Sequence, residues 1–134
     1  MITNKKEKYQ IRSIKNNIAF ISFKPNGYIN EASEDFLNAM GYSLSEVVNK
    51  HHRIFCSSSL VNSSEYQNFW NELNKGKKQQ GKMLRFDKYG NKVWIEATHF
   101  PVIRNNKVVE VIKIATDVTK SHEESLSKEA ILTK

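Results

Sequence analysis

Cysteine, proline and glycine are all scarce in this sequence. It has one cysteine, two prolines and five glycines in 134 residues, and its composition excludes a disulfide scaffold, a collagen and general disorder. Cys56 has no second cysteine to pair with, so we expect a reducing, cytoplasmic compartment. No run of about 18 apolar residues occurs, and no apolar stretch follows the basic start, so neither a membrane span nor a secretory signal is expected.

Acidic residues are outnumbered by basic ones, 14 to 21, which gives a formal net charge of +7. Much of the excess lies in residues 75–92, where Asp87 is the only acidic residue. We interpret this segment as a solvated face, because net charge reports on solubility rather than on fold. The alternative is a small basic nucleic-acid-binding protein. Only Phe86 and Tyr89 are placed to stack on bases there, so no nucleic-acid partner is expected.

The first half of the chain predicts a hairpin followed by short helices. Residues 18–23 are apolar on both alternating faces, as in a strand inside a sheet. The sequence Pro-Asn-Gly at 25–27 predicts a tight turn into a partner strand over residues 28–30. Capping patterns then predict three helices, which begin at Ser33, Ser43 and Ser64.

The second half changes to the two-residue period of strands. Residues 80–87, 93–103 and 108–116 predict three strands joined by two short hairpin turns. With the first hairpin they complete one antiparallel sheet that carries the helices on one face, an α+β fold. A capping box at Ser121 predicts a terminal helix that is too polar to belong to the core, so we expect it to leave the domain.

Several strings, in this order, resemble those of the PAS sensor domain. Residues 30–36 (NEASEDF) resemble the start of the first PAS helix, and residues 41–46 (GYSLSE) are similar to the family's Gly-Tyr-Ser/Thr-x-x-Glu string. Residues 117–119 (DVT) resemble its Asp-Ile-Thr exit signature. Residues 50–56 (KHHRIFC) and 93–97 (VWIEA) resemble the subgroup found in bacterial chemotaxis and aerotaxis receptors and biofilm-dispersal regulators.

This resemblance implies a five-stranded antiparallel sheet with short helices on one face and a C-terminal exit helix. It divides the chain into an N-terminal basic arm or cap (1–16), a PAS domain (17–119) and a signalling helix or linker (120–134). It also implies a sensor without enzymatic activity, which detects a small ligand or the redox or oxygen state in a pocket between helices and sheet. The exit helix would pass the signal to a downstream protein or a fused receptor domain.

Three residues are candidates for holding a cofactor. Some PAS domains bind haem b through a histidine of the helical segment, which makes His51 or His52 a candidate axial ligand. His99 is a weaker candidate. Similarity to aerotaxis receptors suggests FAD beside Trp70, although Arg85 stands where that subgroup has an asparagine. A pocket that retains no cofactor is an equal alternative, with a histidine bonded to the backbone and Trp70 as an ordinary core residue.

Cys56 opens further alternatives. With His51 and His52 just upstream, it could be the nucleophile of an enzyme, a zinc ligand or a thiol redox sensor. Catalysis needs an oriented base, and no carboxylate occurs near Cys56 until Glu65. The spacing His-His-x-x-x-Cys matches no usual zinc site, so we expect neither catalysis nor a metal. A redox sensor would need an exposed thiol of low pKa, which the sequence alone does not reveal.

Trp94 and Phe100 predict an interaction surface. They fall on one face of the fourth strand, while Ile95 and Ala97 fall on the other, which should line the core. Large apolar side chains outside the core usually mark interaction sites. We therefore expect the face of Trp94 and Phe100 to be covered by a second copy in a homodimer, or by the N-terminal arm.

Overall fold

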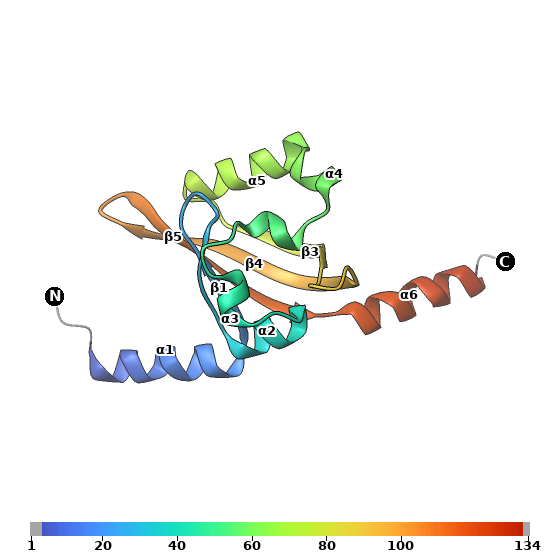
Figure 1. Ribbon diagram of the computed structural model, residues 1–134, viewed down its shortest axis with the longest axis horizontal. Helices are drawn as coiled ribbons and strands as arrows, with labels where there is room; N and C mark the ends of the chain where they lie inside the picture. Colours follow the sequence, from blue (N-terminus) through green and yellow to red (C-terminus); the bar gives the residue numbers. More distant parts are fainter. Residues whose placement is uncertain (1–3, 133–134) are drawn as a thin grey trace.

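The computed structural model describes residues 4–132 and has an α+β fold built on one five-stranded antiparallel sheet (Figure 1). The strands are β1 (Ala19–Phe23), β2 (Ile29–Ala32), β3 (Gln79–Phe86), β4 (Lys92–Arg104) and β5 (Lys107–Asp117). The helices are α1 (Lys5–Asn17), α2 (Glu34–Met40), α3 (Leu44–Val47), the 3-10 helix η1 (His52–Phe55), α4 (Ser58–Val61), α5 (Ser64–Asn74) and α6 (Thr119–Leu132). The predicted fold class is confirmed.

The strand order in the sheet is β2-β1-β5-β4-β3. The first and last strands of the chain therefore lie side by side in its centre, and β5 is flanked by β1 and β4. All five strands occur within two residues of the bounds that alternation predicts. The turn between β1 and β2 requires a glycine at position 27. Gly27 has a φ of +89°, and a Cβ there would lie 2.5 Å from His51 Nε2.

The helices α2 to α5 and η1 cover one face of the sheet and enclose the core. Along β4 the odd positions from Val93 to His99 are buried, whereas Trp94 and Phe100 on the other face are half-buried. This alternation confirms that Trp94 and Phe100 face away from helices α2 to α5. The core consists mainly of apolar side chains of β1, β4, β5 and the helices, among them Ile21, Phe23, Phe36, Phe55, Leu73, Ile95 and Val111.

Two helix starts differ from the sequence prediction. The N-cap of α5 is Ser63, not Ser64, because the Ser63 hydroxyl accepts the hydrogen bond from the Tyr66 amide at 3.2 Å. Helix α6 begins at Thr119 rather than at Ser121. Asp117 Oδ1 accepts from the Thr119 amide at 2.9 Å, so the chain passes from β5 into α6 with only Val118 between them.

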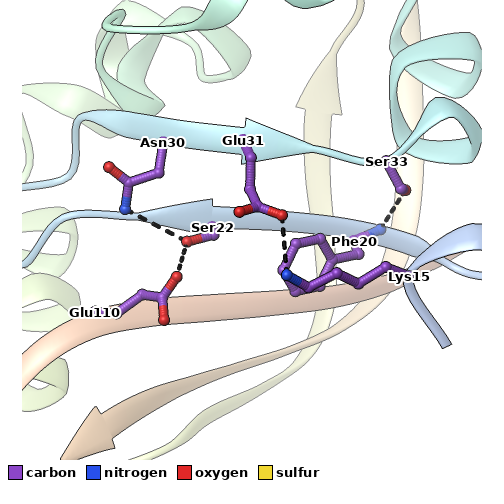
Figure 2. Close-up of polar contacts among 7 residues, drawn as sticks. All are labelled: Lys15, Phe20, Ser22, Asn30, Glu31, Ser33 and Glu110. Carbon is purple, nitrogen blue, oxygen red and sulfur yellow. Dashed lines mark hydrogen bonds and ion pairs between the residues drawn. The ribbon is translucent and has the colours of Figure 1, made fainter. Parts of the chain in front are cut away.

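The N-terminal arm forms the helix α1, and in Figure 1 α1 and α6 project from the body at opposite sides of the view. The end of α1 is fixed to the sheet: Lys15 Nζ lies 3.1 Å from Glu31 Oε1 and 5.0 Å from the centroid of the Phe20 ring (Figure 2). Figure 2 also shows a polar row on this face, in which Ser22 contacts both Asn30 and Glu110. Within residues 4–132, no helix combines the length and apolar character needed to cross a bilayer.

Candidate ligand site between the helices and the sheet

Five polar or ionisable side chains meet in the interior, where helices and sheet face each other. We call them the interior cluster: His52 of η1, Trp70 of α5, Arg85 of β3, His99 of β4 and Lys113 of β5. The exposed fraction is 0% for His52, His99 and Lys113 and 4% for Arg85. Strand alternation puts the three strand residues there, since they share the inward parity of their apolar neighbours.

His99 and Lys113 are directly paired across β4 and β5. Cross-strand partners on one face of an antiparallel pair have their Cβ atoms about 4.5–5.5 Å apart, so the two side chains are neighbours. Both ring nitrogens of His99 and the Nζ of Lys113 are buried without a hydrogen-bond partner in the described part of the chain. Lys113 Nζ lies over two aromatic rings instead, 5.3 Å from the centroid of Phe36 and 5.9 Å from that of Phe55.

Only one of the two ring nitrogens of His52 has hydrogen-bond partners among the described residues. Its Nδ1 lies 2.8 Å from the Tyr66 hydroxyl and 3.6 Å from Cys56 Sγ, while its Nε2 is buried without a partner. Burial, followed by the positive charges of Arg85 and Lys113, holds the pKa of His52 well below its ordinary value. The imidazole is therefore neutral at physiological pH, with one ring nitrogen free for a ligand.

Arg85 brings a charge into this interior. Its guanidinium donates to the Leu84 carbonyl at 2.9 Å and contacts Met83 Sδ at 3.5 Å, but its Nε has no partner. A guanidinium keeps its charge in proteins. Burial lowers the pKa of both Lys113 and His99. Arg85 lowers that of Lys113 further, and Lys113, followed by Arg85, lowers that of His99 further.

The cluster leaves six buried polar atoms without a hydrogen-bond partner in the part of the chain that the structure describes. They are His52 Nε2, Trp70 Nε1, Arg85 Nε, both ring nitrogens of His99 and Lys113 Nζ. Buried polar groups in folded proteins are almost always hydrogen-bonded, and each exception calls for an explanation. All six atoms belong to the interior cluster, which is therefore the candidate ligand site.

A cavity of about 340 Å³ opens beside the cluster, between β3 and the helices α4 and α5. Arg85, Tyr66 and Phe69 line it, and Phe69 also contacts His99, with ring centroids 4.8 Å apart. The rest of the lining is mainly apolar: Leu60, Met83, Leu84 and Phe86, with Ser57, Glu65 and Lys82. This volume lies near the lower end of the range for small-molecule pockets.

The structure brings His52 and Trp70 together and leaves His51 outside the cluster. The Trp70 indole is 9% exposed and meets the His52 ring edge-on, with centroids 5.4 Å apart. His51 is half-buried at the start of η1, where its Nδ1 accepts from the Arg53 amide at 3.0 Å. Its role in the structure is local, at the turn beside Gly27.

Sequence reasoning missed Lys113 and treated Arg85 as part of a solvated basic face. Both carry a signal in the two-residue period: Lys113 stands between Ile112 and Ile114, on the parity of the buried Val111. A lysine at an inward position of a central strand is rare, because burying an unpaired charge is costly. A charged residue at a position that the strand pattern predicts to be buried is therefore the sequence signal for this site.

The haem and FAD hypotheses do not fit this packing. The free nitrogens of His52 and His99 are suitable donors for haem iron, but a porphyrin needs open space in front of them. Six aromatic rings have their centroids within 6.3 Å of the His52 imidazole: Phe23, Phe55, Tyr66, Phe69, Trp70 and His99. Neither a porphyrin nor an isoalloxazine ring has a slot between them, and the adjoining cavity suits a smaller molecule.

Cys56 does not have the environment of a reactive thiol. It is half-buried, and burial raises the pKa of its thiol above the ordinary value. A reactive cysteine needs a lowered pKa, because the thiolate is the reacting form. Within residues 4–132, no three histidine, cysteine or acidic side chains form a group suited to a metal ion.

The exit helix is bound to the sheet at Trp94. The Trp94 amide donates to Thr119 Oγ1 at 2.9 Å, and the Val118 amide donates to the Trp94 carbonyl at 2.8 Å. Lys82 Nζ lies 3.4 Å from His122 Nδ1, so β3 also contacts the first turn of α6. Helix α6 therefore starts against β4, the strand that carries His99 on its other face.

A sheet with helices on one face, a polar cluster between the layers and a helix that leaves from the last strand together define a sensor-type signalling domain. The sequence matches the PAS domain family over residues 16–120. The chain belongs to this family.

Two proteins of known name are similar to this chain in sequence. The biofilm dispersion protein BdlA of Pseudomonas aeruginosa is 34% identical over 102 residues, which cover 75% of this chain and 24% of that protein. The aerotaxis receptor of Escherichia coli is 26% identical over 92 residues, covering 69% of this chain and 18% of the receptor. The chain thus spans about a quarter or less of the length of these relatives.

Solved structures support the fold. An RNA-binding light-oxygen-voltage receptor superposes with a TM-score of 0.80 at 18% identity, covering 100% of this chain and 39% of that one. A light-oxygen-voltage domain studied with a flavin analogue gives a TM-score of 0.70 at 19% identity, with 96% of each chain covered. At such identities the likeness establishes the fold alone.

Proposed function

We propose that this chain is a sensory PAS module that binds a small molecule at the interior cluster and signals through α6. The observation that carries the proposal is the set of six buried polar atoms without partners, all in one place. A buried polar group without a partner lowers stability by about 1–3 kcal/mol. A protein that keeps several such groups in one place is less stable than it could be, and such a loss of stability is common where a site is needed for binding.

The route from the cluster to α6 is short. Lys113 and His99 are cross-strand partners on β5 and β4, and the last residue of β5, Asp117, caps the first residue of α6. A ligand that pairs with Lys113 and His99 biases the position of these two strands. Because Trp94 on β4 holds the start of α6 by two hydrogen bonds, a shift of β4 is transmitted to the helix.

The relatives support a role in chemotaxis or biofilm control. BdlA is named for biofilm dispersion and the second relative for aerotaxis. We therefore propose an output through a downstream signalling protein or a receptor domain, a cytoplasmic location, and no catalysis by the chain itself. We also propose a homodimer in which the half-buried Trp94 and Phe100 lie at the interface.

The test is a thermal-shift screen of the purified chain against carboxylates, amides and phosphate monoesters, with haem and FAD as compounds that the packing predicts not to bind. The double variant His99→Leu/Lys113→Met removes two members of the cluster at little change in volume. Lys107→Met is the matched control, since Lys107 is an exposed lysine on the same strand. An absorption spectrum of the same sample distinguishes haem from flavin.

We expect at least one compound to raise the melting temperature of the parent and of the Lys107→Met control, but not that of the double variant. The melting temperature of the double variant without compound verifies that it folds. If no compound shifts the parent, or if the double variant responds equally, the interior cluster is not a ligand site.

A further inference from the structure

We propose that the ligand of the interior site is a compact organic anion, with its carboxylate toward Lys113, His99 and Arg85 and an apolar body along Phe69 and Met83. The inference rests on the proposed function and names the chemical class of its ligand. Three observations carry it: the charge of the cluster, its hydrogen-bonding capacity and the lining of the cavity.

The charge of the interior has one sign. Four of the five cluster residues carry, or can accept, a positive charge, whereas none of the buried residues that the structure describes is Asp or Glu. The acidic residue in the described cavity lining is Glu65, which is exposed. A cation that is buried without a counter-ion is unfavourable, and an anionic ligand is the missing counter-ion.

The other titratable groups that face the cluster do not supply this counter-charge. Tyr66 and Cys56 contact His52, and burial raises the pKa of both groups, that of Tyr66 to about 12. Both are therefore uncharged at neutral pH. His51 lies beyond Trp70, with ring centroids 6.1 Å apart, and is itself a base. Among residues 4–132, no acidic side chain forms an ion pair with Arg85.

The free atoms of the cluster are mostly donors. Trp70 Nε1 and Arg85 Nε can only donate, and protonated Lys113 and His99 donate as well. A ligand that satisfies them must offer several acceptor lone pairs close together. A carboxylate offers about four such sites on two oxygens, and charge-assisted bonds to it are stronger than neutral ones.

Anion binding is coupled to proton uptake. Burial beside Arg85 disfavours the protonated forms of His99 and Lys113 in the free protein. A carboxylate beside them favours the protonated forms, since an opposite charge raises the pKa of a base. The complex therefore binds a proton that the free protein does not hold, and this uptake is measurable as heat exchanged with the buffer.

The cavity lining defines the rest of the ligand. Of the five cluster residues, Arg85 alone belongs to the cavity lining that the structure describes, and Phe69, also in the lining, contacts His99. Most of the other walls are aromatic or aliphatic, with Met83 and Phe86 among them. A volume of about 340 Å³ suits a small molecule with one ring or a short chain. Benzoate and hexanoate meet both requirements, and benzamide and hexanamide are neutral controls of nearly the same shape.

The experiment is isothermal titration of the full chain with these four probes in Tris and in Bis-Tris, two cationic buffers that ionise with different heats. The variant Lys113→Met removes the amine that would take up a proton beside the bound anion, and Lys107→Met is the control for an exposed lysine on β5. Melting temperatures of both variants without ligand verify that they fold.

We expect at least one of the carboxylates to bind the parent, with an affinity at least tenfold higher than that of its amide and a heat that differs between the buffers. The Kd should rise at least tenfold in Lys113→Met and stay unchanged in Lys107→Met. The inference is wrong if neither carboxylate binds, if an amide binds equally well, or if Lys113→Met retains the affinity. An amide that binds the parent but not Lys113→Met would overturn the anionic class and leave the proposed ligand site standing.

Discussion

The imidazole of His122 stacks on the indole of Trp94, with ring centroids 3.9 Å apart and an interplanar angle of 29°. The first residues of α6 thereby cover a side chain on the outer face of β4, whose inner face carries His99. The Trp94 amide also donates to the Thr119 hydroxyl, and the Trp94 carbonyl accepts from the Val118 amide. The start of α6 is consequently attached to the sheet at the strand that lines the interior cluster.

Substitution of Thr119 should loosen this attachment. Thr119→Val removes the hydroxyl that accepts from the Trp94 amide, a hydrogen bond worth about 1 kcal/mol. We expect faster hydrogen exchange at the Trp94 amide and at the amides of the first turn of α6, by roughly fivefold. The control Ser125→Ala, at an exposed position of α6, should leave exchange at the Trp94 amide unchanged. Unaltered protection in Thr119→Val would show that the hydroxyl does not hold the helix.

Trp70 should be essential for stability. Its indole is buried and packs edge-on against Phe23, with ring centroids 5.7 Å apart. Trp70→Ala creates a cavity, and we expect a loss of about 3–5 kcal/mol in the free energy of unfolding, measured with urea. Trp70→Phe keeps a ring and removes the unpartnered Nε1, so it should lose much less. A loss below about 1 kcal/mol in Trp70→Ala would contradict the described packing.

Lys113 should give the stability a distinctive dependence on pH. Burial holds its pKa well below 10.5, so between the native pKa and 10.5 only the unfolded chain carries this proton. The unfolded state then binds more protons, and the free energy of unfolding rises with pH by about 1.4 kcal/mol per pH unit in that window. Urea unfolding between about pH 8 and about pH 9.5 should show this slope in the parent and its loss in Lys113→Met. Equal slopes in both proteins would mean that Lys113 is charged in the folded state.

Association of two copies should depend on Trp94. Trp94 and Phe100 are both half-buried on the sheet face opposite α2 to α5, where His122 of α6 stacks on Trp94 and which is the face proposed for the homodimer. Trp94→Glu places a charge there, and analytical ultracentrifugation should show a dimer for the parent and a monomer for the variant. The control is Tyr89→Glu in the turn before β4, where the side chain is 72% exposed. A monomeric parent, or a dimeric Trp94→Glu, would exclude this face.

The sheet could be predicted from the sequence, because apolar and polar residues alternate along its longer strands with the two-residue period that is typical of a strand with one buried face. The starts of α5 and α6 were each misplaced by one or two residues, since Ser63 and Ser64 are equally good caps and Thr119 is fixed by a contact with Trp94 that is distant in the sequence. His52 and Trp70 were recognised as inward candidates. Lys113 was missed because charged residues are usually exposed, and its burial depends on pairing with His99 across two strands.

The free energy of unfolding of Lys113→Met, measured by urea denaturation without ligand and compared with the parent at neutral pH, tests the central claim most directly. If Lys113 is retained for ligand binding, replacing its unpartnered amine by an apolar group of similar size should stabilise the free protein by about 1–3 kcal/mol. The control Lys107→Met should stay within about 0.5 kcal/mol of the parent. A Lys113→Met variant that is less stable than the parent would show that the lysine supports the fold, and would contradict a ligand site at the interior cluster.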